Sequence, residues 1–339
     1  MNSFLSLLLN PFGGAPAGNP GTLNYAREFG PAGGQISSQA AAAYAAVTPK
    51  DARIHSAAGP WSVWGQAYGG YNKTEGNVAA GSHDTTARTY GLATGFDHRA
   101  APDTTVGFAL AGAGENWGVA DGLGGGRADA FQLGVYAAKQ FGAAYLSGAL
   151  AYALHNVTTD RTVTVAGSDH LTANFTAQSV GGRIETGYRF ETAYLGVTPY
   201  AAAQVQGFFT PNYSESAVSG SNVFALSFQS QSTVASRTEL GTWLDKSVML
   251  DNGNRLGLRG RLAWANDQSS NRALTATFQT LPGASFNVAG AAPASNLALL
   301  TAGADYRLAN NVSVGAKFDG ELASNSQTYA GTATVRYTW

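Results

Sequence analysis

The segment that decides the fold is TYAGTATVRYTW, residues 328–339. Successive side chains of an extended strand point to opposite faces. One face carries Tyr329, Ala333, Val335, Tyr337 and Trp339, and the other carries Thr332, Thr334, Arg336 and Thr338. This period of two predicts a half-buried β-strand whose last residue is an aromatic of the apolar face.

The same period begins at Trp61 and continues along the chain. It is clear in RTYGLATGFDHR (88–99), SVGGRIETGYRF (179–190), NRLGLRGRLAW (254–264) and NVSVGAKFDG (311–320). Alternation of apolar and polar residues over such lengths indicates strands with one buried face. We expect twelve strands, near 61–72, 84–99, 103–118, 127–141, 143–158, 174–191, 193–210, 231–247, 254–268, 295–308, 311–322 and 327–339.

The connections between these strands alternate in length. Tight ones fall at 99–103, 141–143, 191–193, 247–254 and 309–311. Longer ones fall at 73–83, 119–126, 159–173, 211–230 and 269–294, followed by a shorter one at 323–326. Short turns at one end and long loops at the other are typical of an antiparallel barrel in an outer membrane.

Composition supports a membrane barrel. The chain has 339 residues, 44% of them hydrophobic and 12% charged, whereas soluble domains carry about 25% charged residues. The longest unbroken apolar run, Ala40 to Val47, is too short for a membrane helix of about 20 residues. A net charge of −1 gives no reason to expect nucleic acid as a partner, and the absence of cysteine excludes thiolate sites and disulfides.

A soluble β-sandwich would also show alternation and regular turns. Its solvent face should be rich in charge, however, because that face lies in water. Here the polar face is mostly Gly, Ser, Thr, Ala and Gln with isolated charged pairs. Charge depletion and loop asymmetry together favour the barrel.

Residues 1–60 differ from the rest. A short apolar stretch, Phe4 to Leu9, precedes the Gly/Pro-rich segments GGAPAGNPG and 30–34, which indicate a flexible linker. No basic segment precedes the apolar stretch, so a signal peptide is not expected within it. The sequence QISSQAAAAYAAVTP predicts an α-helix over 35–48, started by Ser37 or Ser38 and ended by Pro49.

Four segments together resemble the C-terminal translocator (β-) domain of bacterial autotransporters, the type V secretion systems of Gram-negative bacteria. They are WSVWGQAYGGY (61–71), SHDTTARTYGLATGFDHR (82–99), RLAWANDQSSNRALTATFQTLPGASFNVAGA (261–291) and the aromatic end VRYTW (335–339). The PGASF segment with its flanking strand is the most specific of these. The resemblance covers residues 61–339 and extends to the helix before them.

The resemblance implies an all-β fold: a twelve-stranded antiparallel transmembrane β-barrel with an N-terminal α-helix in its lumen. Residues 1–34 would be a residual passenger end and linker, 35–60 the lumenal helix and its connection, and 61–339 the barrel. The implied function is a pore that assists export of an upstream passenger polypeptide to the cell surface. A free-standing porin for small solutes is the alternative. The implied partners are outer-membrane lipid, the barrel-assembly machinery and the passenger in cis, with no cofactor.

Several sets of residues are candidates for these roles. The predicted lumen-facing polar residues are Arg183, Glu185, Arg189, Arg237, Glu239, Arg259, Arg261, Asp305, Lys317 and Asp319. Opposite charges two positions apart, such as Arg183 with Glu185 and Arg237 with Glu239, can pair with each other or across strands. The predicted lumenal helix presents Gln35, Gln39 and Tyr44, and the predicted membrane-assembly signal is Val335, Tyr337 and Trp339.

A set of aromatic residues in the predicted strands favours an interfacial girdle over a ligand platform. The set comprises Trp61, Trp64, Tyr90, Phe190, Tyr200, Trp243, Trp264, Tyr306, Tyr337 and Trp339.

The sequence offers little catalytic chemistry. The five histidines have no metal-ligand spacing, and His83 and Asp84, being adjacent in a chain, point to opposite faces of a strand. The glycine-rich GLGGGR (122–127) lacks the Lys and Ser/Thr of a phosphate-binding loop. Some autotransporters cleave their passenger with an Asn of the lumenal helix, but the segment 35–48 contains none, although Asn24 lies close upstream. We therefore expect no enzyme activity.

Overall fold

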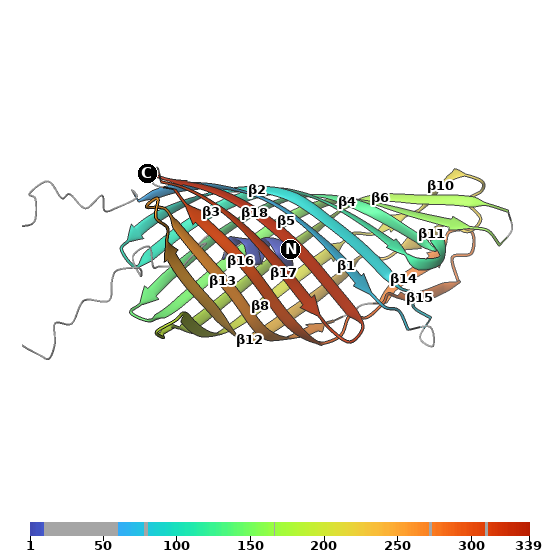
Figure 1. Ribbon diagram of the computed structural model, residues 1–339. Helices are drawn as coiled ribbons and strands as arrows, with labels where there is room; N and C mark the ends of the chain where they lie inside the picture. The colour runs from blue at the N-terminus through green and yellow to red at the C-terminus, as the bar shows by residue number, and fades with distance from the viewer. Residues whose placement is uncertain (10–59, 78–80, 166, 271–272, 309–310) are drawn as a thin grey trace, which may run out of the picture.

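The computed structural model describes residues 1–9, 60–77, 81–165, 167–270, 273–308 and 311–339. Twelve long antiparallel strands form one closed barrel (Figure 1). They are β1 (Trp61–Thr74), β2 (Thr85–Ala101), β3 (Thr104–Val119), β4 (Gly124–Phe141), β5 (Ala144–Val163), β6 (Asp169–Tyr188), β8 (Gly196–Thr210), β12 (Gln231–Met249), β13 (Arg255–Ser269), β16 (Asn296–Arg307), β17 (Val312–Leu322) and β18 (Ser326–Thr338). The prediction of a twelve-stranded barrel is confirmed.

Pairing of the first and last strands closes the barrel. β1 and β18 are in register from Ser62 opposite Thr338 to Thr74 opposite Ser326. Beyond this ladder, Trp61 and Trp339 exchange backbone hydrogen bonds, since each N–H donates to the carbonyl of the other at 3.3 and 3.0 Å. A closed barrel has no unpaired edge, so its backbone groups are satisfied without water.

The two ends of the barrel differ, as expected. The chain termini of the barrel and the tight turns lie at one end, which we call the short-turn end, and the long loops lie at the other, the long-loop end (Figure 1). Two predicted loops are shorter than expected, however. β4 already begins at Gly124 after a 3₁₀ turn, η2 (Ala120–Gly122), and β5 and β6 continue to Val163 and from Asp169. The β3–β4 and β5–β6 hairpins are longer than expected because their polar strands stay paired beyond the part of the barrel that carries the large apolar side chains.

The segments 211–230 and 269–294, expected as loops, contain further strands. These are β9 (Tyr213–Ser214), β10 (Ser216–Ser219), β11 (Leu226–Phe228), β14 (Ala273–Phe278) and β15 (Ser285–Ala289), while β7 (Phe190–Glu191) lies at the opposite end. Four of them form a separate sheet in the order β15-β14-β11-β9, whereas β10 pairs with β6 of the barrel. Arg161 of β5 anchors this sheet through a 2.5 Å contact with the buried carboxylate of Glu215.

A short helix that was not predicted, α1 (Asn2–Leu8), lies inside the barrel (Figure 1). Its residues Phe4, Leu5, Leu7 and Leu8 are buried. Sequence analysis assigned this stretch to a passenger end. The predicted lumenal helix 35–48, with Gln35, Gln39 and Tyr44, lies outside the described residues and stays a prediction. Across the described ranges, no helix is both long enough and apolar enough to cross a membrane.

The outer surface and the lumen carry opposite strand phases. Large apolar side chains such as Leu92, Leu150, Ile184, Leu240 and Val335 are exposed on the outside. This apolar belt matches the hydrocarbon of a bilayer. The alternate positions of the same strands point inward and form the site described next.

Candidate functional site

One half of the lumen wall is apolar and built from small residues. The inward positions of β2 to β6 include Ala93, Ala109, Ala111, Ala149 and Ala151, all buried against α1. Two glycines leave room for the larger side chains of the helix. A Cβ on Gly134 would lie 2.5 Å from Leu8 Cδ1, and one on Gly181 would lie 3.0 Å from Leu5 Cδ1. The helix therefore fits into a groove of small residues.

The other half of the wall is charged. Nine of the ten predicted lumen-facing residues occupy the inward phase of a strand, Arg189 follows the end of β6, and six of the ten form ion pairs with one another. Arg183 is central, since its two terminal nitrogens donate to Glu239 at 2.7 and 2.9 Å. A further hydrogen bond of 2.9 Å joins it to Glu185. Arg183 and Glu239 are only 4% and 2% exposed, so this pair is buried within the barrel.

The network continues from Glu239 to β17. Arg261 lies 3.5 Å from Glu239 and 3.7 Å from Asp319, and Lys317 contacts Asp319 at 2.7 Å. Trp243 supports this side of the network, because the guanidinium groups of Arg259 and Arg261 lie 5.3 and 5.2 Å from its ring. Cation–π contacts of this kind stabilise an arginine away from bulk water.

Arg237 does not pair with Glu239, its predicted neighbour on the same strand. It bonds Asp267 at 2.7 Å on the adjacent strand β13 and Glu321 at 2.8 Å on β17. Arg189 similarly pairs with Asp245 at 2.7 Å. Arg237 makes two hydrogen bonds to each of its two carboxylates, and such bidentate Arg–carboxylate pairs are among the stronger hydrogen bonds.

A further cluster, around Asp97 on β2, was missed by sequence analysis. Its carboxylate accepts hydrogen bonds from Ser62 at 2.9 Å, Trp64 at 3.3 Å and Arg336 at 2.6 Å, and also from the Tyr136 hydroxyl. These four partners come from β1, β4 and β18. Asp97 and Arg336 lie on the inward phase of β2 and β18. The alternation that predicts the other lumen-facing residues therefore also marks these two.

The aromatic girdle prediction is wrong for Trp64, Tyr200 and Trp243, which point into the lumen. Trp64 is 1% exposed, and Tyr200 donates a 3.1 Å hydrogen bond to Glu239. The ring of Trp64 lies over Gly95, where an added Cβ would be 2.4 Å from the ring. Other members of the set are exposed, namely Trp61, Tyr90, Phe190, Trp264, Tyr337 and Trp339.

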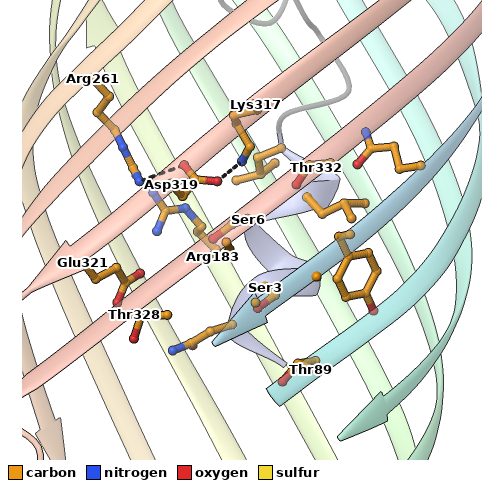
Figure 2. Close-up of a pocket in the computed structure, with 18 of the residues that line it drawn as sticks. Ser3, Ser6, Thr89, Arg183, Arg261, Lys317, Asp319, Glu321, Thr328 and Thr332 are labelled. Atoms are coloured by element: carbon orange, nitrogen blue, oxygen red, sulfur yellow. Dashed lines mark ion pairs between the residues drawn. The ribbon is translucent and has the colours of Figure 1, made fainter. Parts of the chain in front are cut away.

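A cavity of about 240 Å³ separates α1 from the charged wall (Figure 2). The polar residues of α1, Asn2, Ser3 and Ser6, line one side of it. The opposite side includes Arg183, Arg261, Lys317, Asp319 and Glu321. The helix is therefore amphipathic: its apolar side packs against small residues and its polar side faces the cavity.

The described residues contain no group of three or more His, Cys, Asp or Glu that could hold a metal ion. His83 contacts Asp121 at 3.3 Å and His170 contacts Asp160 at 2.5 Å, both at the surface. Within the lumen, His155 Nε2 lies 2.8 Å from Ser179 Oγ. The described residues of the charged wall therefore do not assemble a metal centre.

A model of the autotransporter beta-domain family matches residues 63–319. The chain belongs to this family. Its barrel is an outer-membrane translocator barrel, which is a transport domain rather than a member of an enzyme family. A search of curated protein sequences gave no significant match.

Solved autotransporter barrels have the same fold. The beta domain of the Bordetella autotransporter BrkA superposes with a TM-score of 0.64 at 18% identity, covering 83% of this chain and 100% of its own. The translocator domain of NalP from Neisseria meningitidis gives a TM-score of 0.63 at 16% identity, covering 89% of this chain and 98% of its own. In this autotransporter β-domain, the lumen with α1 and the charged wall is the candidate transport site.

Proposed function

We propose that this β-domain assists the export of a polypeptide joined to the N-terminal side of α1, and that the exported segment reaches the cell surface. The observation that carries the proposal is the position of α1. Because α1 lies inside the lumen of an outer-membrane barrel, a polypeptide joined to it would leave through the lumen and would not have to cross the barrel wall (Figure 1).

The direction of α1 supports export outward. Its N-terminus is the end nearer the long loops (Figure 1). The amino group of Met1 interacts electrostatically with Glu115, which lies four positions before the long-loop end of β3. β1 starts at Trp61, at the short-turn end beside Trp339. A segment preceding Met1 would therefore continue toward the long-loop end, which faces outward in barrels of this class.

The charged wall has a specific part in this proposal. The ten lumen-facing residues would keep the space beside α1 hydrated, so that a polar chain in transit exchanges water for equivalent hydrogen bonds. Fixed ion pairs such as Arg183 with Glu239 already satisfy each other. They would therefore offer few uncompensated charges that hold a passing chain.

Assembly of the barrel is a second part of the proposal. The terminal residues Val335, Tyr337 and Trp339 share the lipid-facing phase, and Tyr337 stacks on Trp339 with ring centroids 5.6 Å apart. We propose that this aromatic end is the feature that the barrel-assembly machinery recognises.

The test is export of a reporter. Residues 1–339 are expressed behind a signal peptide with a small epitope domain fused before Met1, and surface exposure is measured by antibody binding to intact cells. We expect surface labelling that is lost on treatment with external protease. In a matched control the epitope is inserted at Gly142, in the tight turn between β4 and β5, and should remain unlabelled because that turn lies at the short-turn end.

Failure would be recognisable. Barrel insertion is monitored separately by heat-modifiable mobility in gel electrophoresis. An inserted barrel whose N-terminal epitope never reaches the surface would refute export. In that case, current through the same barrel in planar bilayers would favour the free-standing channel instead.

A further inference from the structure

Three arginines lie in one row across four neighbouring strands near the short-turn end. Arg255 on β13 stands directly opposite Arg307 on β16. Ser313 on β17 continues the row, because it stands opposite Arg307 on one side and Arg336 of β18 on the other. We call Arg255, Arg307 and Arg336 the arginine row. Like charges directly opposite each other destabilise an antiparallel pair unless something compensates them.

The arginine row has little compensation within the described part of the chain. Only Arg336 has an ion pair there, its 2.6 Å contact with Asp97. No described carboxylate lies within the 4.0 Å that defines an ion pair with Arg255 or Arg307. Arg336 also has a buried terminal nitrogen, Nη2, without a hydrogen-bond partner among the described residues. Arg255 and Arg307 therefore have no ion-pair partner among the described residues, and Arg336 has one donor without a partner there.

A fourth arginine adds to the positive potential. Arg307 interacts unfavourably with Arg255, with Arg336 and with Arg99 of β2. Asp305, two positions before Arg307 on the same face, is the acid that opposes them. Since β2 and β16 are separated by three strands, these side chains converge from across the lumen rather than along one strand.

Several other lumen cations have ion-pair partners, in contrast to Arg255 and Arg307. Arg183 pairs with two carboxylates, as does Arg237, and Lys317 pairs with Asp319. Paired charges largely cancel at a distance, whereas an unpaired cluster sets the local potential. The arginine row is therefore a local concentration of positive charge without ion-pair partners for Arg255 and Arg307 among the described residues.

We propose that the arginine row binds small oxyanions such as phosphate and makes the passage beside α1 selective for anions. Planar guanidinium groups match oxyanions through two parallel N–H donors. Rings of arginine or lysine are the usual source of anion selectivity in pores. The cavity beside α1 reaches toward the short-turn end through Arg259 and Asp245, which belong to its lining. The proposal is independent of export, since a barrel that exports nothing would still show it.

The first test measures ion selectivity of the folded full-length protein in planar bilayers. Under a potassium chloride gradient, the zero-current potential should have the sign of chloride preference. The double variant R255Q/R307Q should shift this potential toward zero. The control R88Q should leave it unchanged, because Arg88 is exposed on the outward phase of β2. A cation-selective or nonselective wild type, or the absence of current, would overturn the selectivity.

The second test measures binding directly. Calorimetric titration of inorganic phosphate into the detergent-solubilised barrel should give saturable heat for wild type and for R88Q, and this heat should be lost in R255Q/R307Q. Heat-modifiable mobility verifies that each variant is folded. Absence of saturable binding to wild type, or equal binding to folded R255Q/R307Q, would overturn the site.

Discussion

Arg183 on β6 and Glu239 on β12 form a two-fold hydrogen-bonded pair, at 2.7 and 2.9 Å, across the intervening strand β8. Neither residue is more than 4% exposed. Loss of either partner should lower the stability of the barrel, because the other partner then remains as an uncompensated buried charge.

We therefore expect Glu239→Gln to destabilise the barrel by about 3–5 kcal/mol, the usual cost of breaking a buried pair from one side. Thermal unfolding of the detergent-solubilised barrel, followed by loss of heat-modifiable mobility, measures this effect. Glu191→Gln is the matched control, because Glu191 is 68% exposed and lies 3.8 Å from Arg189. Its effect should stay within about 0.5 kcal/mol. Equal effects of both variants would contradict burial of the Arg183 pair.

Leu5 and Leu8 hold α1 against the small-residue groove, and both are fully buried. In the variant L5N/L8N we expect the helix to leave the groove, since buried amides without partners are costly. Single-channel conductance should rise, because α1 then no longer fills that half of the lumen. Ser3→Asn on the polar face of α1 is the control and should conduct like wild type. Unchanged conductance of folded L5N/L8N would show that α1 does not limit the lumen.

Two glycines accommodate aromatic rings of the lumen. A Cβ on Gly95 would lie 2.4 Å from Trp64, and one on Gly107 would lie 2.4 Å from Tyr136. We expect G95A and G107A each to lower stability by about 1–3 kcal/mol, as overpacking does. Gly112→Ala, on the same strand as Gly107, meets nothing within 4 Å and should be neutral or stabilising. Thermal unfolding compares the three variants, and a neutral G107A would refute the close ring contact.

Asp84 lies in the loop between β1 and β2, and its pKa is lowered below 3.8 by the Gly76 amide and by Lys73. A lowered pKa means that the carboxylate stabilises the loop above pH 3.8, and that this contribution is lost as pH falls through the folded-state pKa. The chemical shift of the Gly76 amide proton should report this titration. A midpoint at or above 3.8, or the same titration in Asp84→Asn, would contradict the assignment.

The C-terminal Trp339 joins the two closing strands through its backbone contacts with Trp61. Deletion of Trp339 removes these hydrogen bonds and the stacking partner of Tyr337. We expect a lower fraction of heat-modifiable barrel in the outer membrane. Trp264→Ala is the control, because Trp264 is almost equally exposed, 46% against 45%, but lies away from the seam. Equal losses in both variants would indicate a general effect of removing an exposed aromatic residue.

The barrel was predictable because its physical signal is local and repeated. Each strand alternates between lipid and lumen, so a period of two marks both the strand and its inward face, as it does for Arg261 and Asp319. Strand positions followed directly from this pattern. The partners of individual charges did not, because the choice of Asp267 over Glu239 by Arg237 depends on strand stagger, which alternation does not reveal.

α1 escaped prediction for a different reason. Asn2–Leu8 is too short for a helical period to stand out, and isolated helices of this length are unstable in water. Its stability comes from tertiary contacts with residues such as Ala109 and Gly134, which lie more than 100 positions along the chain. Similarly, β14 pairs with β11 of the neighbouring loop as well as with β15 of its own, and pairing between two loops is not a property of either loop alone.

The groove that holds α1 makes the helix equivalent to a tethered ligand of its own barrel. A ligand that binds only the folded state stabilises that state by mass action, by about 2.7 kcal/mol when its concentration is 100 times its dissociation constant. Covalent attachment keeps the local concentration of α1 high, because helix and groove belong to the same chain. Any chain that displaces α1 from the groove must therefore compete with this local excess, and the barrel is less stable for as long as the groove is empty.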